Sequence, residues 1–133
     1  MAITSAICNS FKQEILEAEH NFTASTGNTF NLALYTSSAT LGASTTAYSS
    51  SNEITNSSGT AYSAKGKALT SVTPTLDSST AVCDFADVSW TSASFTANGC
   101  LIFNDSHSTD AAVCAVAFGG DKTVSSGTFT IQF

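Results

Sequence analysis

The sequence predicts a mostly β protein, an antiparallel β-sandwich or barrel of about 7-8 strands with one short N-terminal amphipathic helix. Two features support this prediction. Apolar and polar residues alternate with a period of two in most apolar segments, as they do in half-buried strands. Turn-forming residues separate these segments at fairly regular intervals, and a single segment has helical periodicity. The 133 residues fit one domain spanning residues 1–133.

The helix is predicted over residues 10–20. Ser10 and Gln13 have the spacing of a capping box at its start. The apolar positions at helical spacing are Phe11, Ile15, Ala18 and Phe22. This apolar face indicates that the helix lies on the sheet. His20, at the predicted C-terminal end, is expected to cap the helix or to face solvent.

Strands are predicted for the remaining apolar segments: residues 29–36, 67–72, 81–86, 88–95, 100–103, 112–118 and 128–133. Pro74 is expected to end the second of these strands, because proline lacks the backbone N–H that a ladder needs. A turn is expected at residues 119–122, which read Gly-Gly-Asp-Lys. Residues 100–103 and 112–118 are apolar at consecutive positions, which favours central strands covered on one side by the helix.

The last strand alternates strictly. Phe129, Ile131 and Phe133 share one face, and Thr128, Thr130 and Gln132 share the other. Because chain termini fray unless they are tied down, an apolar final residue indicates that this strand is docked. We expect Phe129 and Ile131 to fill the core, and Phe133 to lie at its edge or under a neighbouring subunit.

The longest polar stretch is residues 37–62, which is rich in Ser, Thr, Gly and Asn. Short extended pieces are expected there, with Tyr48, Ile54 and Tyr62 as anchors. Loops of this length in compact domains are usually functional or mobile.

Charge excludes one class of partner. Charged residues are only 11% of the chain, there is no arginine, and the net charge is −6. Binding to nucleic acid is excluded, because phosphate contacts need Lys and Arg. No apolar stretch is long enough to cross a membrane, and no secretory signal is visible, so synthesis in the cytoplasm is expected. A weakly charged surface rich in hydroxyl groups suits packing against copies of the same chain, which favours a homo-oligomer, either a dimer or a trimer.

Few residues suggest catalysis. His107 lies near serines and aspartates within residues 104–110, but catalytic triads are assembled across a fold and not from one loop. Asp84 and Asp87 are expected to face opposite sides of an extended chain and to bind local backbone amides. Asp105 and Asp110 could contribute to a calcium site, although the usual loop pattern is absent. Cys83 and Cys114 are expected to be buried thiols, and a disulfide between neighbouring strands is the less favoured alternative. We expect no catalytic, cofactor-binding or metal-binding residues.

Several segments resemble a known family. They are residues 10–14 (SFKQE), 19–22 (EHNF), 30–38 (FNLALYTSS), 45–48 (TTAY), 52–53 (NE), 64–69 (AKGKAL), 84–87 (DFAD) and 127–133 (GTFTIQF). Together they are similar to a family of small virion structural proteins of tailed bacteriophages. The resemblance covers nearly the whole chain and implies no catalytic residue.

The resemblance implies a bacteriophage virion structural protein, made in the host bacterial cytoplasm and located in the virion. The favoured role is a capsid decoration (cement) protein that stabilises the head by binding the major capsid protein. Alternatives are a tail-tip or tail-fibre component, in which residues 37–62 contact the host, and a small glycan hydrolase. The residues expected at the assembly interface are Phe129, Ile131, Phe133, Tyr48 and Tyr62.

Overall fold

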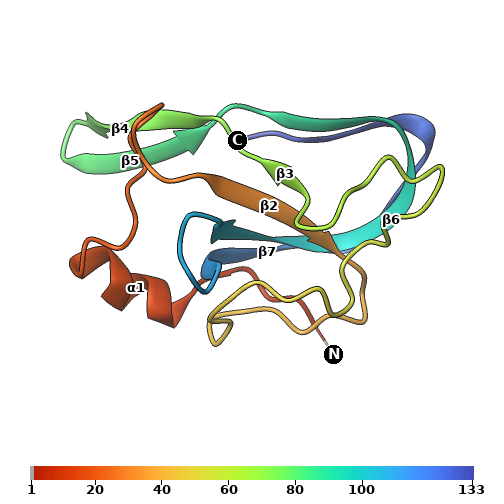
Figure 1. Ribbon diagram of the computed structural model, residues 1–133, viewed down its shortest axis with the longest axis horizontal. Coiled ribbons are helices and arrows are strands. Elements are labelled where there is room, and N and C mark those ends of the chain that lie inside the picture. Colours follow the sequence, from red (N-terminus) through yellow and green to blue (C-terminus); the bar gives the residue numbers. More distant parts are fainter. Residues whose placement is uncertain (1) are drawn as a thin grey trace.

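The computed structural model describes residues 2–133 (Figure 1). These residues form one helix, α1 (Asn9–Leu16), and seven strands: β1 (Ala6–Ile7), β2 (Phe30–Tyr35), β3 (Lys67–Ala68), β4 (Ser71–Asp77), β5 (Thr80–Phe85), β6 (Val88–Asn104) and β7 (Ala111–Ile131). Five strands form one antiparallel sheet in the order β1-β7-β6-β2-β3, and β4 and β5 form a second. The predicted class, a mostly β sandwich with one short N-terminal helix, is confirmed.

One long hairpin supplies most of both layers. Its register pairs Val88 of β6 with Ile131 of β7 at one end and Asn104 with Ala111 at the other. Figure 1 shows both strands curving round at one end of the molecule. The first half of β6 and the last half of β7 therefore form one layer. This layer lies over a second layer, which consists of β2, the last half of β6 and the first half of β7. Four register shifts interrupt the pairing, and such bulges allow strands to bend.

The predicted turn at residues 119–122 is wrong, because β7 continues through it. Gly119 and Gly120 have φ values of 74° and 143°, and they lie in a bulge opposite Asn98 of β6. The Asn98 amide donates to Asp121 Oδ1 at 2.8 Å across this bulge. The segments predicted as separate strands at 88–95 and 100–103 are likewise one strand. Pro74 does not end its strand, because it falls at the register shift in β4 where no ladder bond is lost.

Apolar side chains pack on both faces of the central strands. The larger cluster lies between the two layers and includes Phe30, Leu32, Leu34, Trp90, Phe95 and Ile102. The smaller cluster lies on the opposite face of β2 and includes Ile3, Ala33, Tyr35, Leu41, Leu101 and Phe103. The central strands are thus covered on both faces, as predicted. The second face is covered mainly by the N-terminal segment and residues 39–48, and not by the helix.

The helix is shorter than predicted, because it ends at Leu16 and Ala18 adopts a left-handed φ of 62°. The capping box is wrong: Cys8 is the N-cap, and the buried Ser10 hydroxyl has no partner among the described residues. Phe11 packs against both clusters, whereas Ile15 is 40% exposed. The helix therefore docks mainly through its first turn.

The C-terminal strand keeps its predicted alternation. Phe129 and Ile131 are partly buried and pack against the larger cluster. Phe133 is 46% exposed, and its ring meets the ring of Phe85 with 5.4 Å between centroids. The Phe133 N–H donates to Asp87 Oδ1 at 3.1 Å. The final residue is thus held at the edge of the core.

Candidate functional site

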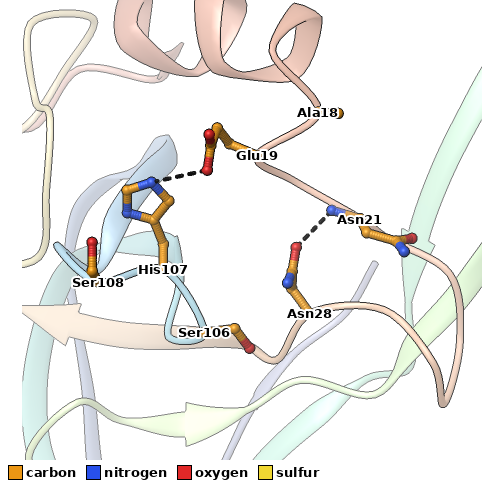
Figure 2. Close-up of a pocket in the computed structure, with 7 residues that line it drawn as sticks. All are labelled: Ala18, Glu19, Asn21, Asn28, Ser106, His107 and Ser108. Carbon is orange, nitrogen blue, oxygen red and sulfur yellow. Dashed lines mark hydrogen bonds and ion pairs between the residues drawn. The ribbon is translucent and has the colours of Figure 1, made fainter.

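A polar pocket of about 350 Å³ lies between the segment that follows α1 and the loop that joins β6 to β7 (Figure 2). Its lining residues are Ala18, Glu19, Asn21, Asn28, Ser106, His107 and Ser108. His107 Nε2 lies 3.5 Å from Glu19 Oε2, as the dashed line in Figure 2 marks. This pocket contains the histidine and serines that the sequence offered for catalysis.

Hydrogen bonds determine which ring nitrogen of His107 carries the proton. The Thr109 backbone N–H donates to Nδ1 at 3.3 Å, so Nδ1 is an acceptor and the proton of the neutral ring lies on Nε2, towards Glu19. The Ser106 hydroxyl accepts from the Thr29 N–H at 2.8 Å. Within residues 2–133 no serine hydroxyl is hydrogen-bonded to His107. Among the described residues, the hydroxyl that contacts this ring is that of Thr109, whose Oγ1 lies 3.0 Å from Nδ1.

The other histidine is buried, which corrects the prediction that His20 caps the helix or faces solvent. Its side chain is 0% exposed, and Nε2 lies 2.8 Å from Glu14 Oε2. Asn104 Nδ2 lies 3.1 Å from Nδ1. Because an amide nitrogen can only donate, Nδ1 of the neutral ring accepts and Nε2 donates to Glu14. His20 therefore ties the helix to the end of β6 and cannot reach a substrate.

The aspartates that the sequence singled out bind protein groups. Asp84 accepts from the Phe85 N–H at 2.8 Å, and Asp87 accepts from the N–H of the final residue. Lys65 Nζ lies 2.8 Å from Asp105 and 2.9 Å from Asp110. Hydrogen bonds to these two carboxylates raise the pKa of Lys65. An ammonium group thus occupies the position considered for calcium.

The cysteines are all free thiols. Burial raises the pKa of Cys100 to about 12 and that of Cys114 to about 11, so both stay protonated at neutral pH. Cys83 was expected to be buried, and this prediction is wrong, because it lies on the exposed β4–β5 hairpin.

This hairpin is exposed along almost its whole length. Every residue from 72 to 84 is exposed, and Figure 1 shows β4 and β5 projecting from one end of the sandwich. Leu76 is 73% exposed, Val72 44% and Val82 39%. We call Ser71–Phe85 the β4–β5 arm. An isolated two-stranded hairpin is only marginally stable in water, so this arm gains stability when another surface covers it.

An apolar groove of about 360 Å³ begins at the base of the arm, between α1, β7 and the C-terminus. None of its lining side chains is charged; they belong to Ile7, Phe11, Phe22, Cys83, Phe85, Ile102, Val113, Cys114, Val116 and Phe133. Ile7 is 49% exposed and Val116 37%, so the rim is open to a partner. The arm and the groove together form the candidate assembly surface.

The residues expected at the assembly interface are not gathered in one place. Phe133 lines the groove, whereas Phe129 and Ile131 face a shallower hollow beside Phe118. Tyr48 is partly buried, and its ring stacks on Phe103. Tyr62 is 2% exposed, so the structure places it in the core, with little side chain left for a partner.

Sequence reasoning missed Leu76, Ile7 and Val116. One signal was available: residues 77–80 read Asp-Ser-Ser-Thr between two short apolar segments, which is typical of a hairpin turn.

Comparisons of the chain with protein-family models, with curated proteins and with solved structures found no match. Within the described residues, no group of three or more His, Cys, Asp or Glu side chains is placed to hold a metal ion. Nor does this part of the chain contain a helix with the length and apolar character needed to span a membrane.

Proposed function

We propose that this protein is a structural component of a bacteriophage virion, and that it acts as a capsid decoration protein that stabilises the head by binding the major capsid protein. The observation that carries the proposal is the β4–β5 arm. Its apolar side chains are exposed on both of its faces, which suits an element that is completed by contact with other subunits.

The rest of the molecule supports the same role. The side chains with catalytic potential in the polar pocket are bound to one another and to backbone amides. Charged residues are only 11% of the chain, so large parts of the surface can be buried against protein at low desolvation cost. The family resemblance of residues 10–14, 30–38 and 127–133 adds the virion as the setting.

The first test is the copy number of this protein per particle, measured by quantitative mass spectrometry against the major capsid protein. A decoration protein is expected at one copy per capsid subunit, or at a simple fraction of that ratio. A few copies per particle would overturn the decoration role and point to the tail, where residues 37–62 would be tested for binding to host cells.

A second test adds purified protein to heads that lack it. The expected result is saturable binding and a higher temperature of head disruption. Binding that does not saturate, or heads that are no more stable afterwards, would contradict a decoration role even if the copy number is high.

A further inference from the structure

We infer that two copies of this chain form a twofold dimer in which the β4–β5 arm of each copy lies in the apolar groove of the other. This inference deepens the proposed function by naming the first partner of the assembly surface. The dimer itself can be tested on the purified protein, whether or not the protein belongs to a virion.

The pairing of β4 with β5 fixes which side chains of the arm share a face. Leu76 is paired with Ala81, and residues paired directly across two strands share a face. Cys83 and Phe85 follow Ala81 at intervals of two along β5, so they lie on that same face. This face, which we call the groove-side face, is apolar from Leu76 to Phe85, and Ser71, which is paired with Phe85, adds an uncharged hydroxyl at its base.

The opposite face of the arm differs in charge. Asp77 and Asp84 each neighbour a groove-side residue in sequence, and they pair with Thr80 and Val72. Both carboxylates therefore lie on the opposite face. The arm thus has one uncharged face and one that carries two negative charges.

The arm and the groove are continuous. Cys83 and Phe85 belong to both, because they line the groove and also lie on the groove-side face of the arm. A single apolar strip therefore runs from Val116 and Ile7 at the far rim, across the groove, to Leu76 near the arm's tip. One chain thus carries both an apolar hollow, which is the groove, and an apolar projection, which is the arm.

A second copy of the same chain is the occupant that this strip favours. A twofold interface needs one surface patch that complements itself, and a strip with a projection at one end and a hollow at the other meets this requirement. The protein carries a net charge of −6, which opposes self-association wherever charged groups meet. None of the groove's lining side chains is charged, and the carboxylates of Asp77 and Asp84 lie on the other face of the arm. The apolar side chains of a second copy can therefore bind here without facing a charged side chain.

The test measures the mass of the purified protein by light scattering after size-exclusion chromatography, and its dimer Kd by analytical ultracentrifugation. The wild-type protein is expected to be a dimer. Leu76→Asp on the arm and Val116→Asp on the groove rim should each raise the Kd by about thirtyfold or more, the effect of losing a buried anchor. Circular dichroism and thermal unfolding check that each variant is folded.

Matched controls carry the same kind of change elsewhere. Leu16→Asp alters a side chain that is 88% exposed on α1 and lies outside the groove lining, and Val82→Asp alters the opposite face of the arm. Leu16→Asp should keep the wild-type Kd, and Val82→Asp should raise the Kd much less than Leu76→Asp does. If either control dissociates the dimer as strongly as Leu76→Asp does, the contact is not the groove-side strip and the inference is overturned.

Mixing the two variants separates this arrangement from others. The intact arm of Val116→Asp can enter the intact groove of Leu76→Asp, so the mixture should form a heterodimer with one of the two contacts restored. If no heterodimer forms, the arm of one copy contacts the arm of the other and not its groove, and the inference is overturned. A wild-type monomer or trimer would overturn it too. If the protein is a monomer but binds heads saturably, the dimer is refuted and the proposed function still holds. If it is a dimer but does not bind heads, the dimer holds and the proposed function is refuted.

Discussion

The Tyr62 hydroxyl donates a hydrogen bond to Glu53 Oε1 at 2.7 Å while it accepts one from the Leu34 backbone N–H at 2.9 Å. Tyr48 donates to the other carboxylate oxygen of Glu53 at 2.6 Å. Two distant points of the polar segment are thereby fixed to β2. This explains how a stretch with little regular structure is held on the sandwich.

Replacing Tyr62 with Phe should lower the free energy of unfolding by about 1–3 kcal/mol, because the buried Leu34 N–H loses this acceptor and Glu53 loses a donor. Tyr48→Phe is the matched control. Tyr48 is partly exposed, so water can replace its hydroxyl and the loss should stay below about 1 kcal/mol. Urea unfolding of both variants measures the difference. Equal losses would contradict the central position assigned to Tyr62.

Alkaline pH should destabilise the protein through the same network. Burial, and then the hydrogen bond to Glu53, raise the pKa of Tyr48 from 10.0 to about 12. Since the folded-state pKa lies above the unfolded one, the stabilisation is complete below pH 10 and is lost as the pH rises towards 12. The loss approaches about 1.4 kcal/mol per pH unit for this one group.

Unfolding free energies measured between pH 9 and pH 12 check this expectation. Tyr35, Tyr62, Cys100 and Cys114 also have raised pKa values and contribute to the same decline. Tyr48→Phe isolates the contribution of Tyr48. In this variant the free energy of unfolding should fall less steeply between pH 10 and pH 12, while the contributions of the other groups remain. An unchanged slope would show that Tyr48 ionises as freely in the folded protein as in the unfolded chain.

The helix should depend on Phe11 much more than on Ile15. Phe11 contacts both core clusters, and its ring lies 4.9 Å from the ring of His20 between centroids. Phe11→Ala should therefore cost about 2–4 kcal/mol. Ile15→Ala removes a side chain that is 40% exposed and should cost below about 1 kcal/mol. Thermal and urea unfolding distinguish these values, and a larger loss for Ile15 would refute the docking through the first turn.

Gly66 occupies a position where a side chain does not fit. Its φ is 66°, and an added Cβ would lie 1.8 Å from the Leu32 carbonyl oxygen. Gly66→Ala should therefore destabilise the protein by more than about 2 kcal/mol. Gly59→Ala is the control, because Gly59 has a φ of 88° but open space around it, so that only the backbone cost of about 1 kcal/mol applies. Similar losses in urea unfolding would mean that the backbone near Leu32 yields to the methyl group.

Local pattern predicted the strands of this fold but not how they join. Alternation identified the last part of β7, because burial on one face leaves a period of two, and a run of consecutive apolar residues identified the first part. The glycines between them favour a turn and a bulge equally, since both need a positive φ. Their pairing opposite Asn98 of β6 decides the outcome, and that partner lies about twenty residues away in the sequence.

The candidate site was harder to predict for the same reason. His20 is buried through its contact with Asn104, which a local reading of residues 10–20 cannot anticipate. Leu76 lies between two predicted strands, because Pro74 was expected to end the first of them, so no pattern indicated that Leu76 belongs to an exposed strand. Only the structure shows that nothing in the described chain covers it.

Truncations at the C-terminus should separate folding from assembly. Deleting residues 132–133 removes Phe133, which is 46% exposed at the groove, while Ile131 stays in the core. This variant should unfold near the wild-type temperature but form a weaker dimer.

Deleting residues 130–133 also removes Ile131 and the Thr130 hydroxyl, which is hydrogen-bonded to Ser89 at 2.7 Å. Loss of the apolar side chain and of the pairing with β6 should lower the free energy of unfolding by about 2–4 kcal/mol. Differential scanning calorimetry and sedimentation measure the two properties separately. If the longer deletion melts at the wild-type temperature and still assembles, the terminal strand is not part of the core. If the shorter deletion already unfolds the protein, Phe133 acts within the monomer and not at the assembly surface.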